Sequence, residues 1–311
     1  MDTPILLLIF NRPGFTKTVL ESIIKGKPSK LYVAADGPRP YHQEDIDLCL
    51  KTKAIIKETS FKFPVITLFR DENLGCKNAV SSAIDWFFSH ESEGIILEDD
   101  CLPNQDFFQF CEKLLERYRD DTRIMMISGD NFFYEYHISD SYYFSRMTHI
   151  WGWATWKRAW KHYDVNMELW NSFKEKKNLH HMFPKHKYWK GWEELMDNTY
   201  SGKMNTWDYQ WQFTCWMQGG LSIMPKVNLV TNIGTLDPSG THTNPSGSDE
   251  NIILSKSLDY PIKHPKFIIP DYYADNIMLE RIFPTNRKKL VLRWCQKSYE
   301  SFFRIIRLKH S

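Results

Sequence analysis

The strongest constraint on the fold is the repeated alternation of short apolar runs and longer amphipathic segments in the first 130 residues. The apolar runs lie at residues 4–10, 30–36, 64–70, 94–100 and 123–130. None of them alternates between apolar and polar residues, as a strand with one face in solvent does. We therefore expect five strands that are buried on both faces, as in parallel sheets.

The segments between these runs place apolar residues three and four positions apart, which is typical of helices packed on a core. They cover residues 16–26, 43–59, 76–90 and 105–121. A repeat of strand, helix and strand requires right-handed crossovers between parallel strands. The predicted fold class is therefore α/β, with a mostly parallel central sheet flanked by helices.

Polar residues follow each of the five predicted strands. They are Asn11 and Arg12, Asp36 and Gly37, Arg70, Asp71 and Asn73, Glu98 to Asp100, and Asp130 and Asn131. Ligands of parallel α/β sheets bind in the crevice beyond the carboxyl ends of the strands. The sequence thus predicts a polar, largely acidic site at one edge of the sheet.

Three consecutive acids, Glu98, Asp99 and Asp100, follow the fourth apolar run. Such acids repel one another unless a cation lies among them. Mg²⁺ and Mn²⁺ prefer oxygen ligands and are typically held by one or two carboxylates, with substrate phosphates completing the shell. An acidic turn with solvated side chains is the alternative, and the buried strand before the acids favours a metal site.

Several other kinds of site are excluded by missing motifs. The chain has neither G-x-x-x-x-G-K-[ST] nor a G-x-G-x-x-G after the first strand, which argues against a P-loop NTPase and a classical dinucleotide-binding fold. It has no H-E-x-x-H, and its six cysteines form no C-x-x-C pair, which argues against zinc sites and a disulfide framework. The remaining possibility is a nucleotide site in which strand-end side chains and a metal ion hold the ligand.

Charge and hydropathy bear on partners and location. A formal net charge of +2, without a nucleic-acid-binding motif, gives no reason to expect nucleic acid as a partner. The scattered cysteines favour a reducing compartment. The first apolar run is too short for a signal peptide, and no run approaches the length of a spanning helix. We expect a cytoplasmic protein, with peripheral association at the inner face of the membrane as a second possibility.

The second half of the chain is rich in aromatic residues. Most of the 12 tryptophans lie between Trp151 and Trp216, and they are suited either to a core or to stacking on sugar rings. Residues 205–234 predict a helix that ends at Gly219-Gly220 and is followed by one more strand. A loop rich in Gly, Ser, Thr and Pro covers residues 235–248.

The last segment, residues 287–309, predicts a basic amphipathic helix. The residues on one helical face are Arg293, Lys297, Glu300, Arg304 and Arg307, and the apolar residues fall largely on the opposite one. Such a helix lies on an anionic membrane surface or packs on its own domain, and the pattern leaves both open.

Five motifs in this order resemble the GT-A glycosyltransferases, in particular the N-acetylglucosaminyltransferase I family and its bacterial relatives. They are FNRP (10–13), ADG (35–37), EDDCLPNQDFF (98–108), WGWATWKRAW (151–160) and WDYQW (207–211). The resemblance covers roughly residues 4 to 245. It implies the GT-A fold, known from nucleotide-diphospho-sugar transferases.

The resemblance also implies roles for residues on the nucleotide side. Asp100 would be the metal ligand, and Glu98 and Asp99 would contact the ribose or the donor sugar. Arg12 and Asp36 would bind the nucleotide, expected to be uridine, with Lys77 or Asn78 near its base or phosphate.

On the acceptor side, Asp208 of WDYQW matches the position of the family's general base. A helix N-terminal acid, favoured by the helix dipole, is the alternative role for Asp208. Ser239, Thr241 and His242 match a loop that closes over the diphosphate, although DPSGTHT (237–243) departs from the family's sequence there. A loop histidine such as His242 is equally suited to simple solvation.

Together these features predict a metal-dependent inverting glycosyltransferase. It would use Mn²⁺ or Mg²⁺ and transfer N-acetylglucosamine or a related hexosamine from a UDP-sugar to a glycan or lipid-linked glycan. The predicted catalytic domain covers residues 1–250, with a nucleotide-binding half (1–135) and an acceptor-binding half (136–250), and residues 251–311 form an extension. A sugar nucleotidyltransferase and a non-catalytic carbohydrate-binding protein are the alternatives.

Overall fold

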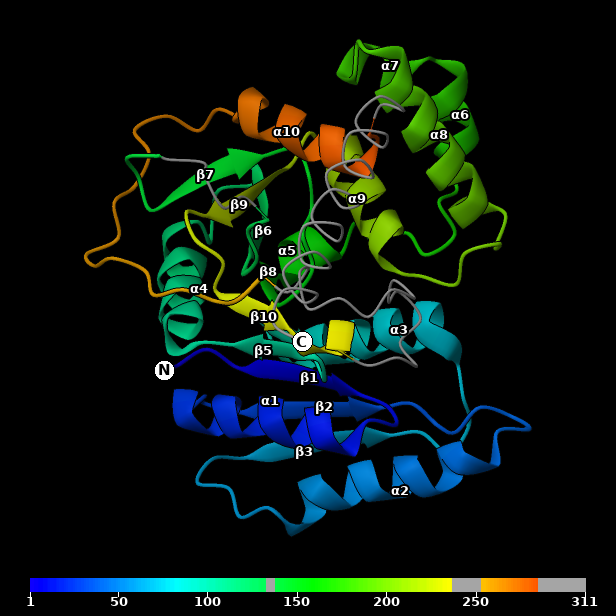
Figure 1. Cartoon of the computed structure of the whole chain (residues 1–311), viewed down its shortest axis with the longest axis vertical. Coiled ribbons are helices and arrows are strands. Elements are labelled where there is room, and N and C mark those ends of the chain that lie inside the picture. Colours follow the sequence, from blue (N-terminus) through cyan, green and yellow to red (C-terminus); the bar gives the residue numbers. More distant parts are fainter. Residues whose placement is uncertain (133–137, 237–252, 285–311) are drawn as a thin grey trace, which may run out of the picture.

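The computed structural model describes residues 1–132, 138–236 and 253–284. An eight-stranded sheet forms its centre, with helices on both faces (Figure 1). The strands of this sheet are β1 (Ile5–Ile9), β2 (Leu31–Ala35), β3 (Val65–Phe69), β4 (Glu93–Glu98), β6 (Ile124–Ser128), β7 (Tyr142–Ser145), β8 (Trp153–Trp156) and β9 (Leu221–Pro225).

The strand order is β3-β2-β1-β4-β8-β6-β9-β7. The first four strands pair in parallel, and β6 pairs in parallel with β9. β8 is antiparallel to both β4 and β6, and β7 is antiparallel to β9. β4 and β6 therefore point the same way, so that all strands of the sheet except β7 and β8 share one direction.

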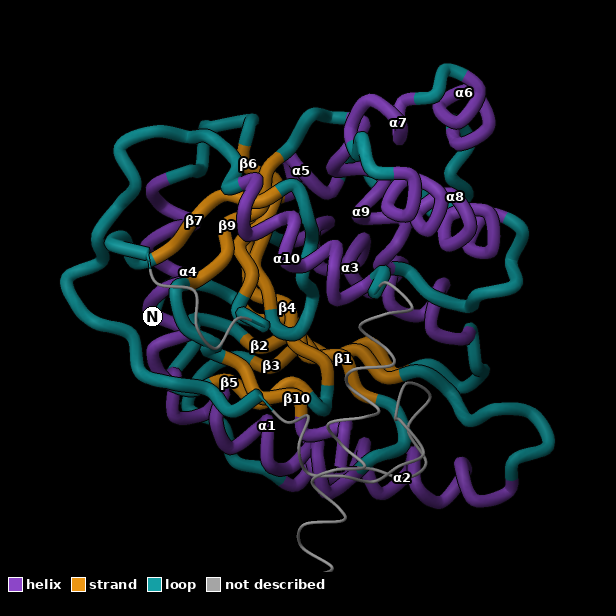
Figure 2. The backbone as a smooth tube through the Cα atoms, turned by 45° about the horizontal axis from the view of Figure 1, so that its top comes forward, coloured by secondary structure: helices purple, strands orange, loops and turns teal. Residues whose placement is uncertain are grey.

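Alternate residues of the central strands pack against helices on opposite faces of the sheet. On one face, Ile5 and Leu7 share an apolar cluster with α1 (Pro13–Gly26) and α4 (Gln105–Arg117). On the other, Leu6 and Leu8 share a cluster with α3 (Gly75–His90) and α9 (Asp208–Met217). α2 (Gln43–Glu58) packs outside α1. Figure 2 shows helices on both sides of the twisted sheet.

The predicted fold class is confirmed: an α/β fold with a mostly parallel central sheet flanked by helices. All five apolar runs form strands, and the four amphipathic segments between them form α1 to α4. The expectation that all five strands are buried on both faces is wrong for β3, which is only partly buried because it lies at the edge of the sheet. α1 begins three residues before its apolar pattern because Pro13, at its first position, has the backbone geometry that starts a helix. The predicted helix ending before Gly219-Gly220 and the strand after it are α9 and β9.

The aromatic second half forms the core of a helical lobe as well as part of the sheet. The lobe consists of α6 (Trp170–Glu175), α7 (Asn178–Met182) and α8 (His186–Tyr200), which lie beside α9 in Figure 1. It shares an apolar cluster with α9 and with α10 (Tyr272–Ile282). Trp153, Trp156, Trp170, Trp207 and Trp211 are fully buried, so these tryptophans serve the core.

A second sheet of two strands supports the chain just after β4. β5 (Cys101–Pro103) pairs antiparallel with β10 (Val230–Asn232), which continues into the short 3₁₀ helix η1 (Ile233–Leu236). The N–H of Ile233 donates to the carbonyl oxygen of Asp100 at 2.8 Å. Residues far apart in the sequence thus fix the backbone of the acidic turn.

Within the described ranges, no helix combines the length and the apolar character that crossing a bilayer requires. One short helix not yet described, α5 (Lys157–Trp160), follows β8 directly. The predicted amphipathic helix at residues 287–309 lies outside the described residues.

Candidate active site

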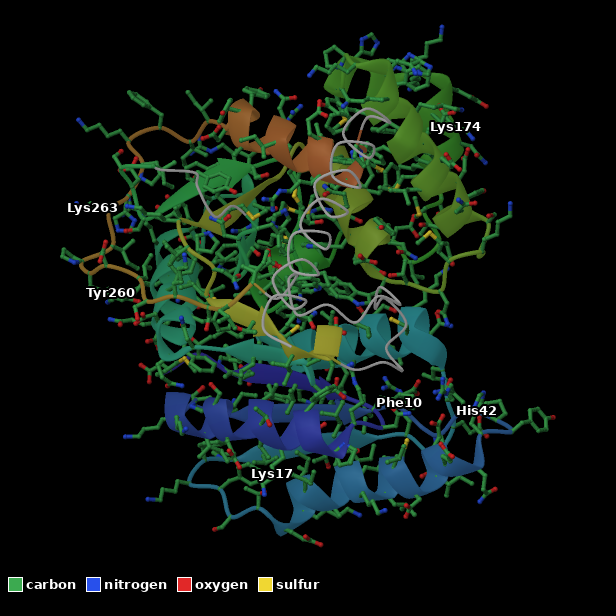
Figure 3. The ribbon with its side chains drawn as sticks, viewed as in Figure 1. Phe10, Lys17, His42, Lys174, Tyr260 and Lys263 are labelled. Atoms are coloured by element: carbon green, nitrogen blue, oxygen red, sulfur yellow. The ribbon has the colours of Figure 1, made fainter. Side chains whose placement is uncertain are left out.

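The three consecutive acids lie where β4 ends in the middle of the sheet. Glu98 is the last residue of β4, and Asp99 and Asp100 form the turn into β5. Asp99 is buried and accepts a hydrogen bond of 3.4 Å from the N–H of Phe10, which follows β1. Figure 3 labels Phe10 at this edge of the sheet, and Tyr260 and Lys263 on the far side of the molecule.

Arg12 is the cation that lies among these acids. It precedes α1, and its Nη1 donates to Asp100 Oδ2 at 2.9 Å while its Nη2 pairs with Asp99 Oδ1. Burial alone lowers the pKa of Arg12, but the two carboxylates raise it well above its usual value. The sequence placed Arg12 and the acids at the same edge of the sheet, but it did not show that they form ion pairs.

The pKa values of two of the acids are raised. Loss of hydration raises the pKa of Glu98, and the carboxylates of Asp100 and Asp99 raise it further. Burial likewise raises the pKa of Asp99, although Arg12 acts in the opposite direction. Three carboxylates around one guanidinium leave an excess of negative charge when all are ionised, so the cluster favours a further cation.

The carboxylate of Asp100 is suited to a hard divalent cation. Its oxygens are the kind of ligand that Mg²⁺ and Mn²⁺ prefer. Gly234 of η1 packs directly on this carboxylate, and a Cβ at Gly234 would lie 2.3 Å from Asp100 Oδ2. The bare glycine therefore keeps a space at Asp100 that any other residue would fill.

Among the residues that the structure describes, no group of three or more His, Cys, Asp or Glu side chains is arranged to hold a metal ion. A magnesium or manganese site completed by substrate phosphates needs only one or two protein carboxylates. The donor chemistry around Asp100 fits such a site.

Asp36, after β2, holds the N-terminus of α3 in place. Its carboxylate accepts hydrogen bonds from the N–H groups of Leu74 and Gly75 and from the side chain of Asn73, at 2.9 to 3.2 Å. It also accepts one from the N–H of Gly37. Acceptors at a helix N-terminus satisfy N–H groups that have no partner within the helix. The predicted contact of Asp36 with a nucleotide remains a prediction.

Lys77 and Asn78 lie in the first turn of α3, beside the start of α9. The N–H of Lys77 donates to Asn205 Oδ1 at 3.0 Å. A Cβ at Gly75, whose φ is +74°, would lie 2.8 Å from Asn205 Nδ2. Asn205 thus joins α3 to the segment that leads into α9, a role that the sequence did not predict although Asn205 lies just before the WDYQW motif.

Asp208 is the first residue of α9 and is half-buried. The hydroxyl of Thr206 donates to Asp208 Oδ1 and orients the carboxylate. The negative charge of Asp208 contributes to the raised pKa of Glu98. The structure therefore brings Asp208, from the second half of the chain, close to the acids that follow β4.

Cys76, an exposed residue in the first turn of α3, is within range of the charges of acids from three elements. Crowding by protein atoms raises the pKa of its thiol to about 12, and the carboxylates of Glu98, Asp208 and Asp36 add to this shift. The acids after β2, after β4 and at the start of α9 thus surround the first turn of α3. They form one site at the carboxyl edge of the sheet.

A buried acid that follows β6, Asp130, lies next to a buried histidine that precedes β8, His149. Asp130 Oδ1 and His149 Nδ1 are 2.8 Å apart, without the alignment of a hydrogen bond, and the N–H of Trp151 donates to Asp130 Oδ2. The ring of Phe132 packs on His149. Sequence reasoning assigned no role to His149 because its proximity to Asp130 depends on β8 lying beside β6.

Ser239, Thr241 and His242, predicted to close over the diphosphate, lie outside the described residues.

No family model and no curated protein sequence matches this chain. Among solved structures, parts of the chain resemble TarS residues 1–349 from S. aureus, with 9% identity and a TM-score of 0.33 over 50% of this chain and 47% of that one. A cytidylyltransferase from Leptospira borgpetersenii matches with 14% identity and a TM-score of 0.35, over 57% of this chain and 73% of its own length. The chain thus spans less than half of the TarS fragment.

A third structure, 4-diphosphocytidyl-2C-methyl-D-erythritol synthase from Anaerococcus prevotii, matches with 7% identity and a TM-score of 0.30, over 57% of this chain and 76% of that one. Similarity this distant says nothing about the reaction of the present chain.

Proposed function

We propose that the protein is a metal-dependent inverting glycosyltransferase that moves N-acetylglucosamine or a related hexosamine from a UDP-sugar to a hydroxyl of a glycan or lipid-linked glycan. One observation carries the proposal: Asp208 at the start of α9 and the acids after β4 approach one another at the carboxyl edge of the sheet. Such a transfer needs two acidic functions, one at the leaving diphosphate and one at the acceptor.

The leaving-group side of the site is Asp100 with Arg12, Glu98 and Asp99. Asp100 would hold Mg²⁺ or Mn²⁺, which when bound offsets the negative charge that develops on the diphosphate. Arg12 already pairs with Asp99 and Asp100, and its guanidinium is suited to a phosphate oxygen as well. Glu98 and Asp99 would accept hydrogen bonds from the ribose or the donor sugar.

The acceptor side is Asp208. The acceptor hydroxyl attacks the anomeric carbon from the face opposite the diphosphate, forming one C–O bond as the bond to UDP breaks, and its proton passes to the Asp208 carboxylate. The hydrogen bond from Thr206 orients that carboxylate before the acceptor binds. Lys77 would contact the base or phosphate, and Asp36 acts by fixing the start of the helix that carries it.

The test of the donor site is thermal unfolding with UDP and a panel of UDP-sugars, with and without Mn²⁺. A ligand that binds only the folded state at 100 times its Kd stabilises that state by about 2.7 kcal/mol. We expect a Mn²⁺-dependent rise in Tm for UDP and one UDP-sugar, which Asp100→Asn abolishes. Asp47→Asn, an exposed acid on α2, is the matched control and keeps the shift.

Two results would contradict the proposal. Pyrophosphate release from a nucleoside triphosphate and a sugar phosphate would identify a nucleotidyltransferase instead. Sugar binding that depends on neither nucleotide nor metal would identify a carbohydrate-binding protein.

The test of the base is Asp208→Asn. We expect turnover of the UDP-sugar to fall by about 10²- to 10⁴-fold, because the acceptor proton loses its acceptor, while the Mn²⁺-dependent binding of UDP persists. Turnover within a few-fold of wild type in a folded variant would show that Asp208 is not the base and only stabilises the N-terminus of α9.

A further inference from the structure

A pocket of about 300 Å³ lies between α3 and the loop after α5. One wall is the polar side of α3, with Asn78, Ser82 and Asp85 on successive turns. Tyr163 and Val165 form the other wall. This volume is at the lower end of the range for small-molecule sites, which suits a ligand of monosaccharide size.

The aromatic wall of the pocket is held rigidly. The ring of Tyr163 stacks on Trp160, with centroids 4.2 Å apart and planes 12° from parallel. The Tyr163 hydroxyl donates to the carbonyl oxygen of Trp207 at 3.0 Å. A fixed aromatic ring offers an apolar surface to the C–H groups of a sugar at little cost in conformational entropy.

The opposite wall presents hydrogen-bonding groups that the protein leaves available. Asp85 Oδ1 accepts from Trp160 Nε1 at 2.7 Å, which fixes the carboxylate and leaves its second oxygen to the pocket. Asn78 is exposed and lines the pocket, so its amide is accessible to a ligand. Asp85 is the one charged residue among the described residues that line the pocket, and its carboxylate disfavours an anionic ligand; Arg70 lies behind the wall and donates to Ser82 Oγ at 2.8 Å.

The pocket adjoins the candidate active site at both ends. Leu74, at its edge, donates its N–H to Asp36. Tyr163 is anchored to Trp207, the residue before Asp208. Burial raises the pKa of Tyr163, and the charges of Asp208 and Asp85 add to this shift.

We propose that this pocket binds one neutral pyranose unit of the acceptor glycan, with Asp85 and Asn78 bonded to its hydroxyls and Tyr163 against its C–H face. The proposal rests on the glycosyltransferase function proposed above and names the class of its acceptor. A carboxylate and an amide next to an aromatic ring recognise hydroxyl groups and reject a carboxylated or phosphorylated sugar. The acceptor unit would then lie beside Asp208, the group that receives its proton.

The test is saturation-transfer NMR with the methyl glycosides of glucose, galactose and N-acetylglucosamine, and with methyl glucuronide as the charged comparator. The full-length protein is used, with each glycoside at about 10 mM, which suits a Kd on the order of 1 mM. We expect saturation of at least one neutral glycoside and a weaker signal from the glucuronide. Asn78→Ala and Asp85→Asn each reduce the neutral signal at least several-fold.

Matched variants outside the pocket control for nonspecific effects. Asn276→Ala on α10 and Asp47→Asn on α2 change exposed residues of the same types, and they keep the signal. Asp85→Asn retains an oxygen that accepts from Trp160, and the Tm of each variant shows whether it is folded.

The outcomes separate this proposal from the transferase function. Absence of any glycoside signal, or signals that persist in both pocket variants, overturns the acceptor pocket. If the same samples still respond to UDP and Mn²⁺, the transferase proposal stands without it. If glycoside binding depends on Asn78 and Asp85 but the protein binds no nucleotide, the pocket is a sugar-binding site. The proposed transferase function is then wrong.

Discussion

Asp45 connects the segments that follow the first two strands. Its carboxylate accepts from Asn11 at 2.7 Å and from Arg39 Nε and Nη2 at 2.6 and 3.0 Å. The hydrogen bonds from Arg39 lower the pKa of Asp45 to about 2. Because Asn11 precedes Arg12, this buried acid near the start of α2 helps to fix the backbone that carries the arginine of the candidate site.

The first prediction concerns the pH dependence of stability. Asp45 has a lower pKa in the folded state than the value of about 3.9 expected when unfolded. Its contribution is therefore present above pH 4 and is lost as the pH falls from about 4 to 2. We expect Asp45→Asn to lower the unfolding free energy at pH 7 by about 2 kcal/mol and to flatten its fall with acid, measured by urea unfolding.

Asp47→Asn is the matched control for Asp45→Asn. It removes an exposed ion pair with Lys51 on the same helix, of the kind worth a few tenths of a kcal/mol. If Asp45→Asn keeps the acid sensitivity of the wild type, the hydrogen bonds to Asn11 and Arg39 do not contribute to stability as described.

The start of α3 depends on a glycine for two separate reasons. Gly75 has a φ of +74°, in the left-handed region that costs other residues about 1 kcal/mol or more. A Cβ at Gly75 would also lie only 2.8 Å from Asn205 Nδ2. α3 and α9 thus approach closely at their N-termini, where Asp36 and Asp208 lie.

Gly75→Ala therefore loses stability through backbone strain and through the clash with Asn205. Gly202→Ala is the control, because Gly202 has a φ of +75° but nothing within 4 Å of a Cβ. We expect Gly202→Ala to cost about 1 kcal/mol and Gly75→Ala about 1 kcal/mol more, because the amide of Asn205 must shift and its hydrogen bond from the N–H of Lys77 is weakened; urea unfolding measures both. Equal losses in the two variants would show that α3 and α9 adjust freely at this junction.

The proposed peripheral binding to membranes involves residues 287–309, which lie outside the described ranges. We expect the full-length chain to bind vesicles that contain anionic phosphatidylglycerol and to ignore vesicles of phosphatidylcholine alone, because basic residues near a surface each contribute about 1 kcal/mol. Replacing Arg293, Arg304 and Arg307 by Glu should weaken this binding roughly tenfold or more in a sedimentation assay.

The control for this charge reversal carries the same change elsewhere. Lys17, Lys25 and Lys113 are exposed on α1 and α4, and their joint replacement by Glu should leave most of the binding intact. A full-length protein that does not bind anionic vesicles would favour a terminal helix packed on its own domain.

The sequence predicted the framework of the sheet because strands buried on both faces are visible as continuous apolar runs. It did not predict β8, whose four residues lie in a tryptophan-rich segment and gain their place only by pairing with β4 and β6. The same limit applies within the site. The strand ends placed Arg12 and Asp100 at one edge, but an ion pair depends on side-chain geometry that no sequence pattern encodes.

The insertion of β8 between β4 and β6 also sets an order of events on the ribosome. β6 has no strand of the first 130 residues as a neighbour, so it joins the sheet only after residues 153–156 have been made. In a nascent chain of 135 residues, β4 would be a second open edge besides β3, ready to pair with another chain. The acids after β4 therefore gain their final surroundings late in synthesis, when β8, α9 and β10 have emerged.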